Sequence, residues 1–476
     1  MKEFLESALD EMKFQKVDYG DIRIVNRIYQ YIVYCDGKVD NVSYGEDLGF
    51  GIRVLKGGCW GFSASSSLTK DEVIKAVRKA VKIAEESARF KKEDIRLAEA
   101  EIVKGKYKTE IEEDPFKVSL EEKINLLAET DEIMHKVKGI RTTRNHLFFK
   151  KEHKFFASTE ETEIEQEIYQ SGGRISATAV KDGLTGERSY EGTGGKTCGY
   201  ELIRRLNLKE EAQRVAEEAV ALLSAKECPE GEMDVILDGS TVALTVHETV
   251  GHPTELDRVF GYEVSLAGTT HLTPDKLGKF KFASEIVNIV QDATAKGGLG
   301  TFGYDDEGIP AQKTYLIKDG IFAGYLMSRE TAIKLGLKSN GTMRADGWSR
   351  IPLIRMTNIN LLPGNWELED LIKDTKDGIY LVTATSPSID DKRLNFSISA
   401  EIGWRIRNGK LCEMIRRPFY GGISYEVWRK CDAICNEKYW DIWGIWGCGK
   451  GDPMQEMQVG HGASPLRFRK VKVGKK

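Results

Sequence analysis

Strand-like and helix-like segments are kept apart in this chain instead of alternating, and this arrangement most constrains its fold. Residues 22–64 alternate as antiparallel strands do, with turns at Asp36-Gly37 and Lys56-Gly57-Gly58. Residues 140–195 form a second series of strand-like segments, interrupted by paired glycines. A parallel sheet would need a helix between successive strands. The sequence therefore predicts an α+β fold and not a doubly wound α/β fold.

Helices are predicted from capping residues and from apolar residues at helical spacing. Thr69 and Ser119 each precede a glutamate by three residues, which is the capping-box signature of a helix N-terminus. Residues 4–12 also follow helical spacing, and a charged helix is expected over residues 208–225. Ser240 is expected to cap a further, apolar helix.

The pattern changes after the charged helix, and hairpins dominate the second half. Turns are predicted at Lys318-Asp319-Gly320 and at Asn408-Gly409. A length of 476 residues suggests two or three domains. We predict an N-terminal domain of helices and antiparallel sheet over residues 1–227 and a C-terminal β-rich domain over residues 228–476. The basic tail, residues 470–476, is expected to be a frayed and solvated end.

Composition excludes several classes of function. With 70 basic and 74 acidic residues the net charge is −4, which argues against nucleic-acid binding by the chain as a whole. No run of about 18 apolar residues occurs, so no membrane span is expected. The start, MKEFLESALDEMKF, is acidic where a secretory signal is basic and apolar. Eight cysteines in such a chain predict no disulfide framework. These features predict a cytoplasmic protein.

Two of the seven histidines, His247 and His252, lie in one segment, HETVGH, at the end of the apolar helix. A zinc hydrolase needs two imidazoles directed at one ion, with a carboxylate beside the open coordination position. At about 100° per residue, positions i and i+5 of an α-helix lie about 140° apart. If both histidines bind one ion, the backbone must therefore widen into a π-turn or leave the helix between them. The alternative is a buried core histidine followed by a turn histidine.

A third ligand is sought among the cysteines of the C-terminal half: Cys412, Cys431, Cys435 and Cys448. Cys431 and Cys435 are four residues apart, a spacing more typical of core residues. Cys448 lies in a Gly-rich segment, GIWGCGKG, where a thiolate would suit zinc and Lys450 could help to keep it ionised. The same segment is equally consistent with a tight turn.

Four further stretches accompany HETVGH and the Cys-Gly-Lys segment, and together they resemble the TldD/PmbA family of metallopeptidases. The stretches are YDDEGIPAQ at 304–312, RMTN at 355–358, LLPG at 361–364 and NFSIS at 395–399. They run in order across roughly 235–462, and the N-terminal half has a compatible layout. The chain keeps the ligand set of the metal-bearing TldD type, which the PmbA type lacks.

The resemblance implies a ligand set, a catalytic group and a partner. Zinc would be bound by His247, His252 and Cys448, and Glu248 would transfer protons as the general base. Pro253 departs from the glycine that a relative has at this place. The family acts on small or unfolded polypeptides and assembles as dimers, so a homodimer or a heterodimer with a PmbA-like paralogue is expected.

Three functions follow as hypotheses. The first is a zinc-dependent peptidase with a metal-activated water. The second is a non-enzymatic peptide-binding or regulatory protein of the same fold, and the third is a thiol-based site at Cys448.

Several other residues of these segments have two interpretations each. Asp305, Asp306 and Glu307 would either bind substrate amines or a cation, or shape a turn. Arg355 and Asn358 would either clamp a peptide or satisfy buried carbonyls. The tryptophans near Cys448, which are Trp440, Trp443 and Trp446, would wall a channel or pack in the core.

Overall fold

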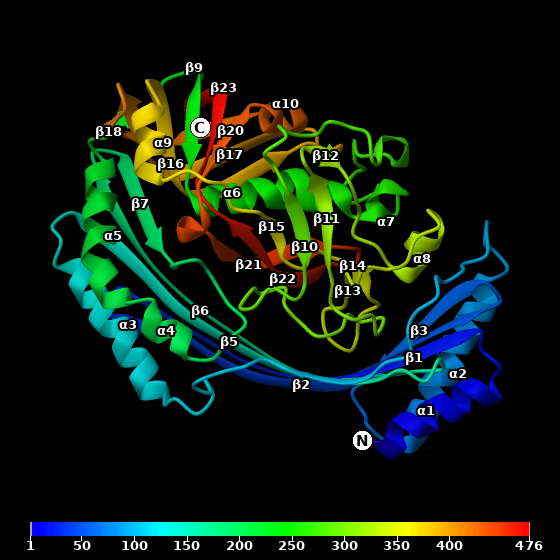
Figure 1. Cartoon of the computed structure of the whole chain (residues 1–476). Helices are drawn as coiled ribbons and strands as arrows, with labels where there is room; N and C mark the ends of the chain where they lie inside the picture. The colour runs from blue at the N-terminus through cyan, green and yellow to red at the C-terminus, as the bar shows by residue number, and fades with distance from the viewer. Residues whose placement is uncertain (1, 476) are drawn as a thin grey trace.

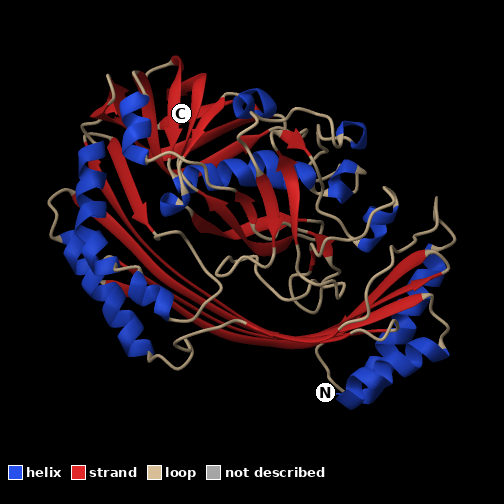
Figure 2. Cartoon of the chain, in the orientation of Figure 1, coloured by secondary structure: helices blue, strands red, loops and turns tan. Residues whose placement is uncertain are grey.

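The computed structural model describes residues 2–475 and has the predicted α+β organisation (Figure 1). The N-terminal half forms a long curved sheet with helices at both of its ends, and the C-terminal half lies in the concave side of that sheet. Figure 2 shows that helices lie at the two ends of the curved sheet and leave its middle uncovered on the convex side, and that one helix crosses the middle of the C-terminal half. The boundary at residue 227 stays a prediction; β8 (Lys226–Glu227) lies before it and pairs with β18 (Lys410–Arg416) of the second half.

The curved sheet has seven strands in the order β3-β2-β1-β5-β6-β4, and β7 also pairs with β6. All neighbours are antiparallel except β4, which runs parallel to β6. The strands are β1 (Tyr19–Cys35), β2 (Lys38–Lys56), β3 (Cys59–Ser65), β4 (Lys104–Lys108), β5 (Ile140–Ser158), β6 (Glu163–Lys181) and β7 (Leu184–Tyr190). Four of them are long enough to connect the two helical ends.

Helices cover one face of this sheet at each end. α1 (Lys2–Phe14) and α2 (Lys70–Ser87) lie at one end, and α3 (Leu120–His135), α4 (Glu201–Arg205) and α5 (Leu208–Leu222) lie at the other (Figure 1). The side chains of Thr69 and Ser119 accept hydrogen bonds from the third residue of α2 and α3, as predicted. Ile22 and Ile24 pack under the first group and Ile32 under the second. Burial of each contributes roughly 1.5–3 kcal/mol.

The alternate residues of β1 face the C-terminal half, because successive side chains of a strand point to opposite faces. Arg23 approaches Asp306, and Arg27 forms an ion pair with Asp346 at 2.9 Å. The two faces of β1 therefore make different contacts. The even-numbered side chains pack against the helices, and the odd-numbered ones contact the C-terminal half.

The second half is organised around a sheet in the order β16-β9-β23-β19-β17-β18-β8, which closes on itself because β16 also pairs with β17. β20 pairs with β23. The remaining bounds are β9 (Gly231–Leu237), β16 (Asp377–Ile389), β17 (Asn395–Arg407), β19 (Pro418–Ile423), β20 (Cys431–Ile434) and β23 (Leu466–Lys475). The expectation of a frayed tail is wrong for residues 470–475: β23 lies between β9 and β19, which pair with residues 471–473 and 472–475. Lys476 lies outside the described residues.

α6 (Gly239–Val246) crosses the middle of this half and belongs to its large apolar core. Its N-cap is Asp238, whose carboxylate accepts from the backbone N–H of Thr241 at 2.9 Å. Ser240, the predicted cap, lies inside the helix and donates its hydroxyl to Asp238. Below α6 runs the hairpin of β21 (Asp441–Lys450) and β22 (Gln455–Ala463) (Figure 1).

Small elements complete the second half. They are β10 (Ile289–Asp292), β11 (Lys313–Lys318), β12 (Ile321–Phe322), β13 (Met343–Arg344), β14 (Leu353–Ile354), β15 (Ile359–Leu361), α7 (Leu256–Val259), α8 (Arg329–Ile333), α9 (Leu368–Asp374) and α10 (Ser424–Arg429). The predicted turns at Asp319-Gly320 and Asn408-Gly409 have positive φ at both residues, as tight hairpins require. Among residues 2–475, no helix has the length and apolar character of a membrane span.

Candidate metal centre

The backbone leaves the α-helical path where the first two candidate ligands lie. α6 ends at Val246, a π-helical turn spans His247–Gly251, and a 3₁₀ turn spans His252–Thr254. The backbone N–H of His252 donates to the carbonyl of His247, five residues earlier. This wider turn brings the two imidazoles together, with ring centroids 4.8 Å apart. The predicted departure from a regular helix is confirmed.

Cys448 reaches the same point from β21. Its Sγ lies 3.7 Å from Nε2 of His252. The Gly-rich segment is a strand of a hairpin and not a tight turn: Cys448 pairs with Met457, and the register shifts between Ile445 and Cys448. Arg355 ties the hairpin together, since its guanidinium donates to the carbonyls of Cys448 and Gln455, one on each strand.

The three residues fit a zinc ion. Zn–N of about 2.0–2.1 Å and Zn–S of about 2.3 Å place tetrahedral donors roughly 3.3–3.8 Å apart. The candidate ligand atoms of His247, His252 and Cys448 all lie within 4.8 Å of one another. Two imidazoles and a thiolate are a donor set that suits zinc. Three protein ligands leave one tetrahedral position for water or substrate, as catalytic zinc sites do. Cys431 and Cys435 are not part of this cluster.

Charge on the cluster favours a thiolate. Burial would raise the pKa of Cys448, but the charges of His247, His252 and Arg355 outweigh burial and hold it well below its usual value. Burial likewise opposes the charged form of His252, whereas the thiolate of Cys448 and the carboxylate of Glu255 raise its pKa to about 9. A metal ion would replace the protons that these groups share.

A carboxylate orients His252 from the side away from the cysteine. Nδ1 of His252 lies 3.1 Å from Oε2 of Glu255, which is fully buried. Arg258 lies 3.1 Å from the same carboxylate oxygen, and Lys450 lies 3.4 Å from the other. Burial opposes the ionised form of Glu255, but Lys450, His252 and Arg258 hold its pKa well below the usual range. Such carboxylate–histidine pairs are common behind zinc ligands.

Lys450 does not have the role expected for it. Its ammonium lies 2.8 Å from Asp257 and donates to the carbonyl of Ile354 at 2.8 Å. Lys450 therefore neutralises the acidic groups behind His252. The cation that stabilises the thiolate of Cys448 is Arg355 instead.

His461 is a neighbour of the cluster that the sequence interpretation missed. Its Nε2 lies 2.8 Å from Nδ1 of His247, and the side chain is fully buried. The only signal in the sequence is a histidine between two glycines, Gly460 and Gly462, shortly after the Cys448 segment.

Glu248 lies in the π-turn beside His247 and is buried, with an exposed fraction of 8%. Arg393 is a cation that interacts with its charge; burial lowers the pKa of Arg393, and Glu248 acts in the opposite direction. Glu248 does not belong to the group of three possible ligands. Its place next to the cluster suits proton transfer more than metal binding.

The acidic residues at 305–307 serve the structure. Asp305 accepts backbone N–H groups of Glu307, Ile309 and Met343 at 2.9–3.0 Å, which shapes the turn. Glu307 lies 3.1 Å from the guanidinium of Arg53 in the curved sheet. Turn formation and docking of the two halves therefore account for this motif.

Arg355 and Asn358 satisfy buried carbonyls. Both are fully buried, and Asn358 donates to the carbonyl of Asp292 and the hydroxyl of Thr301, each at 2.9 Å. The tryptophans behave as packing residues: Trp446 lies against Phe148 with ring centroids 4.6 Å apart. The indoles of Trp440 and Trp443 donate to backbone carbonyls.

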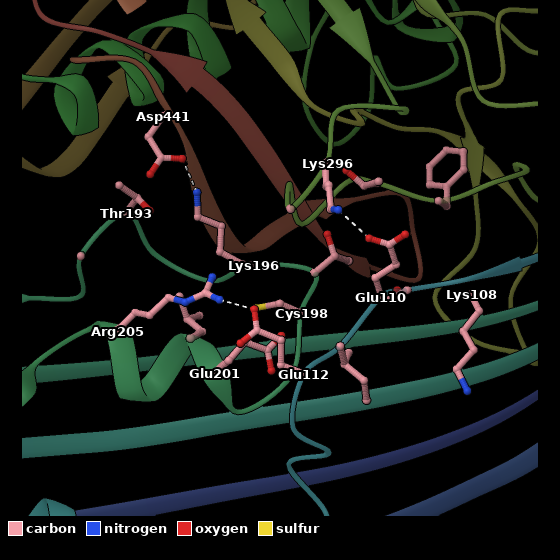
Figure 3. A pocket seen from close by; sticks show the side chains of 18 of the residues that line it. Lys108, Glu110, Glu112, Thr193, Lys196, Cys198, Glu201, Arg205, Lys296 and Asp441 are labelled. Carbon is pink, nitrogen blue, oxygen red and sulfur yellow. Dashed lines mark hydrogen bonds and ion pairs between the residues drawn. The ribbon is translucent and has the colours of Figure 1, made fainter. Parts of the chain in front are cut away.

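A cavity of about 990 Å³ lies elsewhere, between the segment after β4 and the start of β21 (Figure 3). Six of its charged groups form ion pairs: Lys196 with Asp441 and Lys296 with Glu110, each at 2.5 Å, and Arg205 with Glu112. Burial and the charge of Glu201 raise the pKa of Cys198, in its wall, to about 12. Glu201 itself accepts hydrogen bonds from the backbone N–H groups of Gly199 and Glu113. The cavity thus offers no reactive thiol, and the metal cluster is not in its lining.

Comparison with known families matches nearly the whole chain. Models of the PmbA/TldA metallopeptidases match in three parts: domain 1 at residues 20–84, the central domain at 113–225 and the C-terminal domain at 230–475.

Individual relatives agree with this. A metalloprotease of Methanocaldococcus jannaschii is 33% identical over 94% of this chain and 96% of its own length. A zinc metalloprotease TldD homologue of Saccharolobus solfataricus is 25% identical over 96% of each chain. The crystal structure of TldE from Thermococcus kodakarensis superposes with a TM-score of 0.75 at 17% identity, covering 98% of this chain and all of that one, which shows the same fold.

Proposed function

Because this chain belongs to the PmbA/TldA metallopeptidase family, we propose that it is a zinc-dependent peptidase that hydrolyses peptide bonds in small or unfolded polypeptides. The observation that carries the proposal is the convergence of His247, His252 and Cys448 on one point, with a carboxylate in the same turn. The name of the Saccharolobus solfataricus relative supports zinc as the metal.

The chemistry divides between the ion and the protein. Zinc held by His247, His252 and Cys448 would lower the pKa of a water molecule to near neutral and polarise the peptide carbonyl. Glu248 would accept a proton from the attacking water as its oxygen bonds to the carbonyl carbon, and would deliver that proton to the amine nitrogen as the C–N bond breaks. Burial of Glu248 excludes bulk water from this transfer, and Glu255 keeps the ring of His252 in place.

The test is the substitution Glu248→Gln, which keeps the size and hydrogen bonding of the side chain but removes the base. Turnover of a reduced, carboxymethylated polypeptide should fall by about 10²–10⁴. Zinc content, measured by elemental analysis, should remain one ion per chain. Glu263→Gln is the matched control, because Glu263 is also buried but lies outside the cluster.

Two results would contradict the proposal. Undiminished cleavage by Glu248→Gln would show that Glu248 is not the base. A parent protein that binds zinc but cleaves no peptide, alone or with a PmbA-like chain, would favour a peptide-binding or regulatory protein.

We also propose that the chain is a dimer, either with itself or with a PmbA-like paralogue. β2 runs along the border of the curved sheet (Figure 1), and of the described strands only β1 pairs with its residues 38–49. Val39, Val42, Tyr44 and Leu48 are exposed on this stretch. An open edge with apolar side chains is a natural site for pairing with another strand.

Light scattering tests the dimer. The parent should be dimeric at micromolar concentration, and a Val42→Lys/Tyr44→Lys variant should shift towards the monomer because charges block edge pairing. A parent protein that stays monomeric, both alone and after a PmbA-like chain is added, would contradict the proposal.

All eight cysteines are unpaired, which suits the reducing cytoplasm that we propose as the location of the protein.

A further inference from the structure

His461 makes a contact that a core histidine does not need. It lies on β22, next to the strand that carries Cys448, and none of its side chain is exposed. Its Nε2 is 2.8 Å from Nδ1 of His247, and the two rings are nearly perpendicular, at 86°. Two imidazole nitrogens at this distance form a hydrogen bond, in which one nitrogen carries the proton and the other accepts it.

The direction of this hydrogen bond follows from the geometry of His247. The ring has two nitrogens, and Nδ1 is occupied by His461, so Nε2 is the nitrogen available to the cluster. A neutral imidazole that binds a metal through Nε2 carries its proton on Nδ1. His247 therefore donates, and Nε2 of His461 accepts.

His461 must then carry its own proton on Nδ1. Among the described residues this Nδ1 has no hydrogen-bond partner. β15, which contains Ile359, lies beside β22 through the bridge between Asn358 and Gly460. The hairpin and this neighbouring strand thus hold the backbone that carries His461.

His461 is not placed to be a fourth ligand. Its Nε2 faces Nδ1 of His247, which leaves Nε2 of that ring for the cluster, and His461 is not in the group of possible ligands. The two ligand histidines thus have different partners. His252 has the carboxylate of Glu255, whereas His247 has the imidazole of His461.

We propose that His461 is a positioning residue: by accepting the Nδ1–H of His247 it fixes the tautomer and ring orientation that present Nε2 of His247 to the metal. The inference deepens the proposed function and rests on it, because it assumes a metal at His247, His252 and Cys448. Partners of this kind typically change metal affinity by about 10–100-fold when they are removed.

Two substitutions of similar volume separate hydrogen bonding from packing. His461→Gln places a side-chain oxygen near the position of Nε2 and keeps an acceptor, whereas His461→Leu fills the space without one. We expect His461→Leu to lower zinc affinity by about 10–100-fold and His461→Gln to restore it to within a few-fold of the parent. His146→Leu is the control, because His146 packs against Tyr31 in the curved sheet, outside the cluster.

Zinc affinity is measured by competition with a chromogenic chelator on folded protein, checked by circular dichroism. A second readout uses the zinc-loaded parent with ¹⁵N-labelled histidine, in which long-range ¹H–¹⁵N spectra should show His247 protonated at Nδ1. Equal affinities of parent and His461→Leu, or a proton on Nε2 of His247, would overturn the inference alone. A parent that does not bind zinc would overturn the proposed function and the inference together.

Discussion

Arg53 connects the two halves of the molecule, and its loss should destabilise them measurably. Its guanidinium lies 2.7 Å from Asp21 on the neighbouring strand and 3.1 Å from Glu307 in the C-terminal half. No side chain of this triad is more than 3% exposed. Arg53→Met keeps an apolar stem against Trp60 but leaves two buried carboxylates without their cation.

The magnitude follows from burial. Removal of one member of a buried ion pair costs about 3–5 kcal/mol, because the remaining charge stays desolvated. Asp305, whose pKa is raised by burial and by Glu307, adds a further acidic group to the same place. A cost of this size is a large part of the roughly 5–15 kcal/mol that stabilises a typical domain.

Urea unfolding, followed by both tryptophan fluorescence and circular dichroism, measures the loss. Arg53→Met should lower the free energy of unfolding by about 3–5 kcal/mol. Its control is Arg89→Met, which breaks the solvent-exposed pair with Glu86 and should change the midpoint little. Adding Asp21→Asn and Glu307→Gln to Arg53→Met should recover part of the loss. The reasoning is refuted if Arg53→Met and Arg89→Met are equally stable.

Three further outcomes are expected. Cys448→Ser should sharply reduce zinc binding in a chelator competition, whereas Cys431→Ser should bind as the parent does; equal binding by all three proteins would exclude the cysteine ligand. Removal of zinc should lower the unfolding temperature in calorimetry, since a ligand at 1,000 times its Kd stabilises the folded state by about 4 kcal/mol; an unchanged temperature would contradict the site. Burial lowers the pKa of Lys150 to about 8, so the unfolded chain binds more protons above pH 8. Between pH 8 and about 10.5 its contribution to the unfolding free energy therefore rises with pH. Urea unfolding of Lys150→Met at pH 7.5 and 9.5 should lack this rise, and the same rise in both proteins would contradict the assignment.

Local sequence determined much of the secondary structure. The caps at Thr69 and Ser119, the turns at Asp319-Gly320 and Asn408-Gly409, and the parity of β1 were all predictable, because each depends on residues close together in the chain. The π-turn was predictable too, but only on the condition that both histidines bind one ion.

Local signals were misleading where two candidates competed. Asp238 and Ser240 are both good caps, and each also accepts from a backbone N–H of β16. The helix begins at Gly239, so Asp238 is the cap and accepts from the backbone N–H of Thr241. The basic composition of residues 470–476 indicated a solvated end, but alternating lysines are equally compatible with a strand whose other side chains, Val471 and Val473, are buried.

By itself, the sequence determined the α+β class, most helix ends and turns, and the candidate ligands His247, His252 and Cys448. Only the tertiary structure decided that Cys448 meets His252 at 3.7 Å, that Lys450 turns to Asp257, and that His461 contacts His247. The physical reason is the range of the interactions. Caps, turns and periodicity act within a few residues, whereas the partners of a buried charge or imidazole depend on which strands pair and in which register.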